Sequence, residues 1–258
     1  MSDTIYIKSP KEIELMRQAG RITAGARSIA RQAVAAGVTT KQINSLVHEF
    51  IVKSGATPTF LNYGGFKGSA CISVNDEVIH GIPGKKVIHN GDIVSLDVGA
   101  TYKGFVGDCA GTFPCGEVSE EAKKLIEVTR QSFFEGIKFA KPGYRISDIG
   151  AAIQEYVESH GYSVVRDYVG HGIGRNLHEA PEVPNFRPKR RIGRPDPRIV
   201  KGMTIAIEPM VNMGGYEVRV LPDGWTVVTA DGSLSAHYEN TILVTDGEPE
   251  ILTMAEDI

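Results

Sequence analysis

The chain has 258 residues, of which 41% are hydrophobic and 23% charged, and its formal net charge at pH 7 is −3. This composition is typical of a globular protein and excludes a strongly basic nucleic-acid binder, so we expect no DNA partner. The sequence shows no apolar run of membrane-spanning length and no export signal, and the three cysteines lack metal-site spacing. We therefore expect a cytoplasmic protein that does not bind membranes.

Two helices are expected to open the chain. Ser9, Pro10 and Glu12 form a capping box with proline at the first helical position, and apolar residues then recur at helical spacing. A second helix is expected from Thr39, with one apolar stripe, until Gly55 ends it. Both stripes predict helices that pack on a sheet.

A pair of antiparallel strands is expected next, with residues 93–101 and 104–113 joined by a turn at 102–103. In that register Asp97 lies directly opposite Asp108 on one face of the hairpin. Like charges about 5 Å apart repel by roughly 3 kcal/mol at an effective dielectric of ~20, and a cation between them would reverse the sign. Taken alone, the pair could also be two acids on a solvated strand face.

The second part of the chain repeats the first. Two more helices are expected over residues 119–140 and 147–160, and residues 143–161 match residues 37–55 at a constant offset of 106. Residues 202–208 likewise match residues 91–97 at an offset of 111. This repeat places Glu208 at the position of Asp97, and the later Glu239 then corresponds to Asp108.

Two similar halves, about 10–115 and 119–245, predict one α+β domain over residues 1–258, with a curved antiparallel sheet backed by four helices. The four acids are expected to converge at the axis between the halves. Buried like charges need a multivalent cation or protonation. The remaining candidate ligand is His171, whose neighbouring glycines allow the backbone to approach closely.

Six short motifs follow one another along the chain. They are Cys71-Ile72-Ser73-Val74-Asn75, His80-Gly81-Ile82-Pro83, the pair Asp97 and Asp108, the segment from Gly170 to Glu179, Ile207-Glu208-Pro209-Met210-Val211-Asn212, and Tyr238-Glu239-Asn240-Thr241. In order and spacing they resemble, almost end to end, the type I methionine aminopeptidases of the pita-bread fold, peptidase family M24A.

The resemblance implies two divalent metal ions and a bridging water that attacks the peptide bond. The implied metal ligands are Asp97, Asp108, His171, Glu208 and Glu239. By the same resemblance Asp97 and Glu239 touch both ions, and Glu208 also shuttles protons. The oxygen-rich ligand set with one imidazole suits manganese, iron(II), cobalt or zinc.

Residues that bind the substrate are also implied by the resemblance. His178 corresponds to the residue that holds the scissile carbonyl, and His80 to the one that contacts the peptide nitrogen. The implied methionine pocket consists of Phe60, Tyr63, Phe66, Cys71, Leu177 and Trp225. A narrow aromatic slot with a soft sulfur contact suits an unbranched thioether.

The expected function is removal of the N-terminal methionine from nascent proteins by a monomer that prefers a small second residue. An Xaa-Pro aminopeptidase or prolidase shares the fold and ligand pattern and is the enzymatic alternative. A non-catalytic pita-bread module that binds peptides is the alternative of another class.

A basic run lies between His171 and Glu208. It consists of Arg187, Lys189, Arg190, Arg191, Arg194, Arg198 and Lys201. Clustered basic residues could contact ribosomal RNA near nascent chains, although a solvated proline-rich loop is the simpler interpretation.

Overall fold

A computed structural model describes residues 4–188 and 196–254. Within these residues lie four α-helices and one short 3₁₀ helix. The α-helices are α1 (Pro10–Gln32), α2 (Thr40–Lys53), α3 (Glu120–Ile137) and α4 (Ile146–Ser159), and the 3₁₀ helix is Tyr63–Gly65. None of the helices in the described residues combines the length and apolar character needed to cross a membrane.

The predicted helix starts are confirmed by their caps. The backbone N–H of Ser9 donates to a carboxylate oxygen of Glu12 at 3.0 Å, and that of Thr39 donates to Gln42 Oε1 at 2.8 Å. Each reciprocal contact satisfies a donor that the first helical turn leaves free. The third helix ends at Ile137, three residues before the predicted end at residue 140.

The sequence repeat is also confirmed, because α2 and α4 have the same length and are related by the predicted offset of 106. Gly37 and Gly143 precede the two helices with φ of 90° and 102°. Gly55 and Gly161 follow them with φ of 72° and 82°. Equivalent left-handed turns therefore frame both helices.

The strands form one large sheet and two small ones. The nine strands of the large sheet are β1 (Thr57–Pro58), β2 (Ala70–Val74), β4 (Ile93–Tyr102), β5 (Phe105–Pro114), β7 (Gly170–Gly172), β8 (Glu179–Val183), β9 (Thr204–Ile207), β14 (Glu239–Leu243) and β15 (Glu250–Ile251). One small sheet contains β3 (Glu77–Ile79), β11 (Val218–Val220) and β12 (Val227–Thr229), and the other contains β6 (Ser163–Val164), β10 (Met210–Asn212) and β13 (Ser235–His237).

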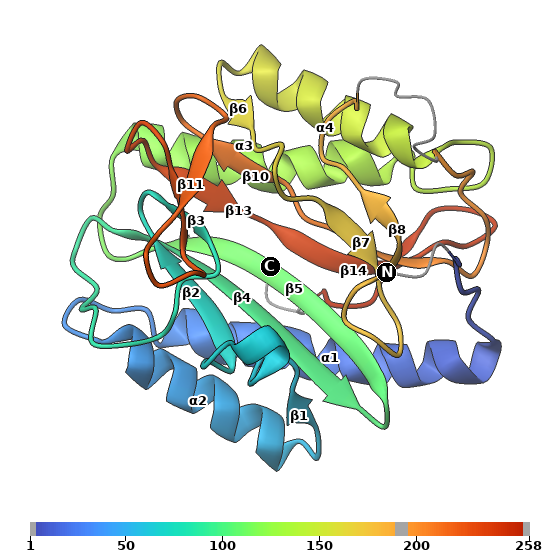
Figure 1. The fold of residues 1–258 in the computed structure, drawn as a ribbon, viewed down its shortest axis with the longest axis horizontal. Helices are drawn as coiled ribbons and strands as arrows, with labels where there is room; N and C mark the ends of the chain where they lie inside the picture. The colour runs from blue at the N-terminus through green and yellow to red at the C-terminus, as the bar shows by residue number, and fades with distance from the viewer. Residues whose placement is uncertain (1–3, 189–195, 255–258) are drawn as a thin grey trace.

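The main path of the large sheet runs β1-β4-β5-β14-β9-β7-β8, and its strand pairs are antiparallel. The β4–β5 pair of the first half therefore meets the β14–β9 pair of the second half at the β5–β14 seam. Figure 1 shows α1 and α2 along one side of this strand array and α3 and α4 along the other. The α+β architecture with two similar halves is as predicted.

The predicted register of the first strand pair was wrong. Asp97 pairs with Ala110, and Asp108 pairs with Gly99, so the two acids are diagonal neighbours instead of directly opposed. The turn consists of Lys103 and Gly104, whose φ values of 48° and 80° are those of a type I′ hairpin turn. The error shifts the pairing by two residues, and because side chains alternate with period two, both acids stay on the predicted face.

The apolar core has three main parts. One cluster packs α1 and α2 on the first half of the sheet, and a second packs α3 and α4 on the other half. A third cluster takes side chains from both halves and lies beside the acids, and it includes Phe60, Phe66, Cys71 and Leu177. This shared cluster is the predicted pocket region.

Candidate metal centre

His171 lies on β7, a short strand in which a glycine stands on either side of it. A Cβ atom on Gly170 would lie 2.4 Å from the carbonyl oxygen of Ala206, and one on Gly172 would lie 2.2 Å from that of Ala180. The flanking glycines are therefore required for β7 to fit between β8 and β9, as their close-approach role predicted. This packing fixes the backbone that presents His171.

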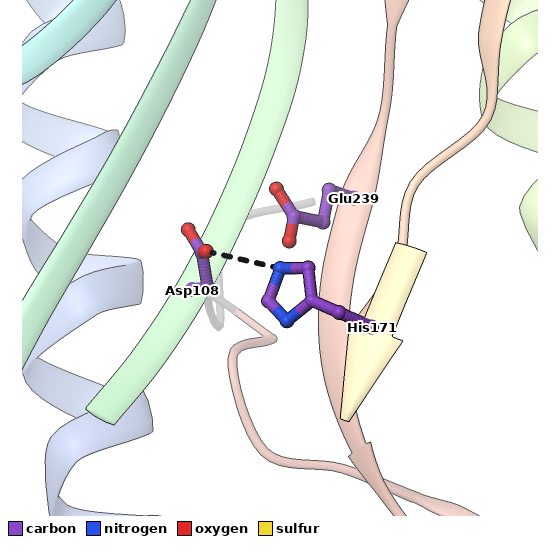
Figure 2. A group of neighbouring side chains, drawn as sticks. All are labelled: Asp108, His171 and Glu239. Carbon is purple, nitrogen blue, oxygen red and sulfur yellow. Dashed lines mark ion pairs between the residues drawn. The ribbon is translucent and has the colours of Figure 1, made fainter. Parts of the chain in front are cut away.

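The four acids come from four neighbouring segments. Asp97 lies within β4, Asp108 within β5 and Glu239 at the start of β14, while Glu208 follows the last residue of β9. Figure 2 shows the Asp108 and Glu239 carboxylates and the His171 imidazole pointing toward one another, with ligand atoms within 4.8 Å of one another.

The His171 imidazole lies between an acid from the first half of the chain and an acid from the second. Its Nε2 atom lies 3.8 Å from Asp108 Oδ2 and 3.6 Å from Glu208 Oε1. Its Nδ1 atom lies 2.8 Å from the carbonyl oxygen of Gly172, so Nδ1 carries the proton and donates it. Burial lowers the pKa of His171 to about 3, and nearby His178 adds to that shift. The imidazole is thus neutral, with the lone pair of Nε2 facing the carboxylates.

Burial raises the pKa of every acid in the cluster, and repulsion between the acids adds to the shift for Asp108, Glu208 and Glu239. Burial raises the pKa of Asp97 to about 7, although hydrogen bonding from Cys71 and Asp108 opposes the shift. For Asp108, burial is again the first cause of a raised pKa, followed by repulsion from Glu239 and Asp97. The pKa values of Glu208 and Glu239 are raised in the same way. Holding all four groups ionised requires added positive charge.

The donor set fits a metal ion. Asp97 Oδ1, Asp108 Oδ1 and Glu239 Oε1 are buried, and none has a hydrogen-bond partner within the described residues. Buried carboxylate oxygens need a partner, and a divalent cation can satisfy several at once. Oxygen ligands with one neutral imidazole suit divalent transition metals. We conclude that Asp108, His171 and Glu239, three of the residues predicted from sequence, form a buried group suited to a divalent metal ion.

Two charged or ionisable residues near the centre were missed from the sequence. Arg27 on α1 is buried, and its Nη1 atom donates to the carbonyl oxygens of Ala110 at 3.0 Å and Glu239 at 3.3 Å. His237 is buried, with Nε2 3.9 Å from Glu208 Oε2. His237 precedes Glu239 by two residues, and that strand periodicity was a usable signal. Nothing local distinguished Arg27 from the other arginines of its helix.

Two further histidines singled out from the sequence, His178 and His80, lie near the centre. The rings of His178 and His171 have centroids 4.4 Å apart, and the Tyr63 hydroxyl lies 2.7 Å from His178 Nδ1. Burial lowers the pKa of His178, and burial with the nearby His178 lowers that of His80 to about 4. His80 adopts a φ of 59°, an unusual conformation for a residue other than glycine. Both imidazoles are neutral at pH 7.

The predicted pocket residues gather next to these histidines. Phe60, Phe66, Cys71 and Leu177 are buried in one cluster, and Trp225 packs against it. The rings of Phe66 and Trp225 are 5.2 Å apart at 69°, a favourable edge-on contact. Tyr63 is 45% exposed, so it lies at the rim of the apolar cluster. Its contact with the centre is the hydrogen bond to His178.

Comparisons with known proteins agree with this geometry. The sequence pattern of metallopeptidase family M24 matches residues 14–246. The methionine aminopeptidase of Clostridium acetobutylicum is 55% identical over 98% of this chain and 100% of its own length. That of Clostridium perfringens is 54% identical over 97% of this chain and 99% of its own length.

Solved structures give the same result. The crystal structure of methionine aminopeptidase from Thermotoga maritima superposes with a TM-score of 0.92 at 49% identity, covering 98% of this chain and 100% of that one. The prolidase of Pyrococcus furiosus superposes with a TM-score of 0.77 at 23% identity, covering 97% of this chain and 66% of that one. The second likeness shows a shared fold alone.

Proposed function

We propose a role for each residue of this centre from the premise that the chain belongs to metallopeptidase family M24 and has its pita-bread fold. The chain is a metal-dependent aminopeptidase that removes the N-terminal methionine from peptides. The observation that carries the assignment of roles is the buried group of carboxylate oxygens without partners, faced by the free lone pair of His171.

Two divalent ions are proposed to bind this centre, held by Asp97, Asp108, His171, Glu208 and Glu239. Two ions are supported by the charge of the site, since four buried carboxylates carry about the charge that two divalent cations neutralise. Manganese, iron(II), cobalt and zinc all suit the ligand set. When bound, such ions lower the pKa of water and stabilise negative charge on a carbonyl oxygen.

Glu208 is proposed to accept and pass on the proton of the attacking water. Its carboxylate is buried beside two neutral imidazoles, with Oε1 near His171 and Oε2 near His237. A buried carboxylate without a cationic side-chain partner is a stronger base than an exposed one. It is therefore suited to general acid and base catalysis.

His178 is proposed to hold the scissile carbonyl oxygen. If the Tyr63 hydroxyl donates to Nδ1, the His178 proton is on Nε2, which is then a donor beside the metal centre. A donor held in advance at that point stabilises the charge that develops on the oxygen. His80, neutral and packed edge-on against Tyr168 and Trp225, is proposed to contact the peptide nitrogen.

The apolar cluster is proposed to bind the methionine side chain. Phe60, Phe66, Leu177 and Trp225 supply apolar walls, and Cys71 supplies a polarisable atom beside Asp97. A flexible thioether packs well against aromatic and sulfur atoms, whereas a branched chain does not fit a narrow slot. We further propose a preference for small second residues, which a comparison of Met-Ala-Ser with Met-Phe-Ser measures.

A metal-dependence profile with methionyl tripeptides tests these roles. The chelated chain should be inactive on Met-Ala-Ser and should regain activity with manganese, iron(II), cobalt or zinc. The same preparation should not hydrolyse Ala-Pro or Gly-Pro peptides. Hydrolysis of the proline peptides instead would favour a prolidase, and metal-independent activity would contradict the proposed centre.

A matched pair of variants separates the loss of a metal ligand from the loss of any single acidic side chain. Asp108→Asn should lose bound metal, measured by elemental analysis after reconstitution, together with activity. Asp246→Asn changes an exposed acid that pairs with Lys201 far from the centre and should change neither. Full metal content in Asp108→Asn would contradict its role as a ligand.

The wider context of the enzyme is also a proposal. Residues 1–258 are proposed to form one catalytic domain, supported by a centre whose ligands come from both halves. A monomer in the cytoplasm that acts on nascent chains is proposed. The three buried cysteines, which are free thiols, support the cytoplasmic location alone. Light scattering of the purified chain tests the monomer.

A contact with the ribosome is proposed for the basic run. Arg187 and Arg198 are exposed, whereas Lys189, Arg190, Arg191 and Arg194 lie outside the described residues. Salt-sensitive cosedimentation with ribosomes that disappears when the run is neutralised would support the contact. Absence of cosedimentation at low salt would rule it out.

A further inference from the structure

We propose that Lys8 and Glu179 are positioning residues for the substrate loop, residues 174–178. This loop carries Leu177 of the pocket cluster and His178 of the catalytic centre. The proposal rests on the proposed function, because it concerns how those two side chains are held. It assigns the N-terminal segment a part in substrate recognition.

Glu179 closes the substrate loop from its C-terminal side. Its Oε1 atom accepts the backbone N–H groups of Arg175 at 2.8 Å and Asn176 at 3.1 Å. Its Oε2 atom accepts a hydrogen bond from Lys8 Nζ at 2.7 Å. Both charged side chains are almost completely buried, with 5% of Lys8 and 4% of Glu179 exposed. One carboxylate thus binds the loop backbone and a distant lysine together.

Lys8 is itself fixed on two sides. Its backbone N–H donates to the carbonyl oxygen of Gly202 at 2.9 Å, and its Nζ also donates to that of Tyr6 at 3.2 Å. A Cβ atom on Gly174 would lie 2.5 Å from Lys8 Cε and 2.8 Å from Glu179 Oε1. The lysine stem therefore packs directly on the first residue of the loop.

The opposite side of the loop is held less firmly. The N–H of Val106 donates to the carbonyl oxygen of Gly174 at 2.8 Å. The side chain of Arg175 is mostly exposed, pairs with Glu12 at 3.1 Å and lies 4.5 Å above the ring of Phe105. Exposed pairs of this kind contribute little, so the buried Lys8–Glu179 pair is the main charged restraint on the loop.

The consequence for catalysis follows from the shared backbone. Removal of the lysine charge leaves a buried carboxylate without its counter-ion, which favours movement of the loop toward water. Leu177 and His178 then move together, and so recognition of the methionine side chain and of the carbonyl oxygen weaken together. A misplacement of about 1 Å can lower a rate on the order of 100-fold.

The first experiment measures kcat and KM of the manganese-loaded Lys8→Met chain with Met-Ala-Ser. We expect kcat/KM to fall on the order of 100-fold, with both a raised KM and a lowered kcat. Discrimination between methionyl and norleucyl peptides should also shrink, because Leu177 is displaced. Lys8→Arg, which keeps the charge, should recover most of the lost activity. Wild-type kinetics and discrimination in Lys8→Met would overturn the proposal.

A double-mutant cycle distinguishes positioning from a general loss of stability. If Lys8 acts through the loop, Lys8→Met should lower kcat/KM by a much smaller factor in a His178→Ala chain than in the wild type. Equal losses in both backgrounds would overturn the proposal. Should Lys8→Met fail to fold, Glu179→Gln gives the test, since its amide oxygen can still accept from Arg175 and Asn176. Unchanged kinetics in a folded Glu179→Gln chain would count equally against it.

Glu250→Gln is the matched control. It breaks the ion pair between Arg17 Nε and Glu250 Oε1, which are 2.7 Å apart and also join distant segments, but it does not touch the substrate loop. Its kinetics should equal those of the wild type. The activity of the wild type on Met-Ala-Ser tests the proposed function, whereas the ratio of variant to wild type tests the positioning role, so the two failures are distinguishable.

Discussion

The two halves of the molecule have the same scaffold and different contents. In the first half Asp108 follows Asp97 by 11 positions, across a two-residue turn between strands of ten residues each. In the second half Glu239 follows Glu208 by 31 positions, and the intervening connection carries Trp225 and four short strands. The repeated part supplies acids to the metal centre. The longer connection of the second half supplies Trp225 to the proposed substrate pocket beside the centre.

The helices show the same division. Under the offset that relates α2 to α4, Arg27 of α1 corresponds to Phe133 of α3. Arg27 is buried against the β5–β14 seam and donates to backbone carbonyls there. Phe133 is buried in the second core, with its ring 5.4 Å from that of Tyr238. One position thus supplies charge near the centre, and its counterpart supplies apolar packing.

If the acids of both halves are equivalent, Asp108→Asn and Glu239→Gln should have equal and large effects. Each removes a charged ligand, and we expect kcat/KM for Met-Ala-Ser to fall on the order of 10³-fold or more. Steady-state kinetics after manganese reconstitution make the measurement. Near-normal activity in either variant would show that one half contributes the centre alone.

The pH dependence of the metal-free chain compares the other two acids of the centre, Asp97 and Glu208. A carboxyl group with a raised pKa stabilises the folded state at low pH, and this contribution is lost as the pH rises through the folded pKa. For Asp97, with a pKa of about 7, the loss between pH 5 and pH 8 is roughly 3 kcal/mol.

Chelated wild type should therefore lose about that much free energy of unfolding relative to Asp97→Asn over this range. The histidine contributions are present in both proteins and cancel. Glu208→Gln should give a difference of the same sign, since burial also raises the pKa of Glu208. Urea unfolding in the presence of a chelator measures both differences. A wild type that becomes more stable relative to either variant as the pH rises would contradict the raised pKa values.

The contrast between Arg27 and Phe133 can be tested by removing each. Arg27→Met should lower the free energy of unfolding of the chelated chain by about 2 kcal/mol, because it removes hydrogen bonds from a charged donor. The loss should be smaller with manganese, which supplies positive charge to the same region. Phe133→Leu should cost on the order of 1 kcal/mol with or without metal. If manganese changed the loss of unfolding free energy equally in the two variants, Arg27 would have no special electrostatic role near the centre.

The two unequal connections give the smallest predicted effects. Gly104 in the first-half turn and Gly224 before Trp225 have φ of 80° and 77°, and a Cβ atom on either would meet open space. Alanine at each position should therefore cost about 1 kcal/mol through backbone strain alone. Gly104→Ala should leave KM unchanged, whereas Gly224→Ala should raise it several-fold. Equal KM values would indicate that the long connection does not shape the pocket.

Much of the fold could be predicted from sequence because its signals are local. The capping box at Ser9 and the apolar stripe after Thr39 indicated two helix starts, and the glycines around α2 and α4 marked the repeat. Period-two alternation placed Asp97 and Asp108 on the correct face even though their register was wrong. The register depends on the type I′ turn at Lys103 and Gly104, and a shift of two residues leaves the alternation unchanged.

The sequence by itself determined the repeat, the faces of the strands and the convergence of the four acids, since each depends on spacing along the chain. The full set of five candidate ligands is what the family resemblance implies. Only the tertiary structure decided the contacts between distant segments. Arg27 meets Glu239 across 212 positions, and Lys8 meets Glu179 across 171. Such contacts leave no periodic signal, because they arise from how finished helices and strands pack on one another.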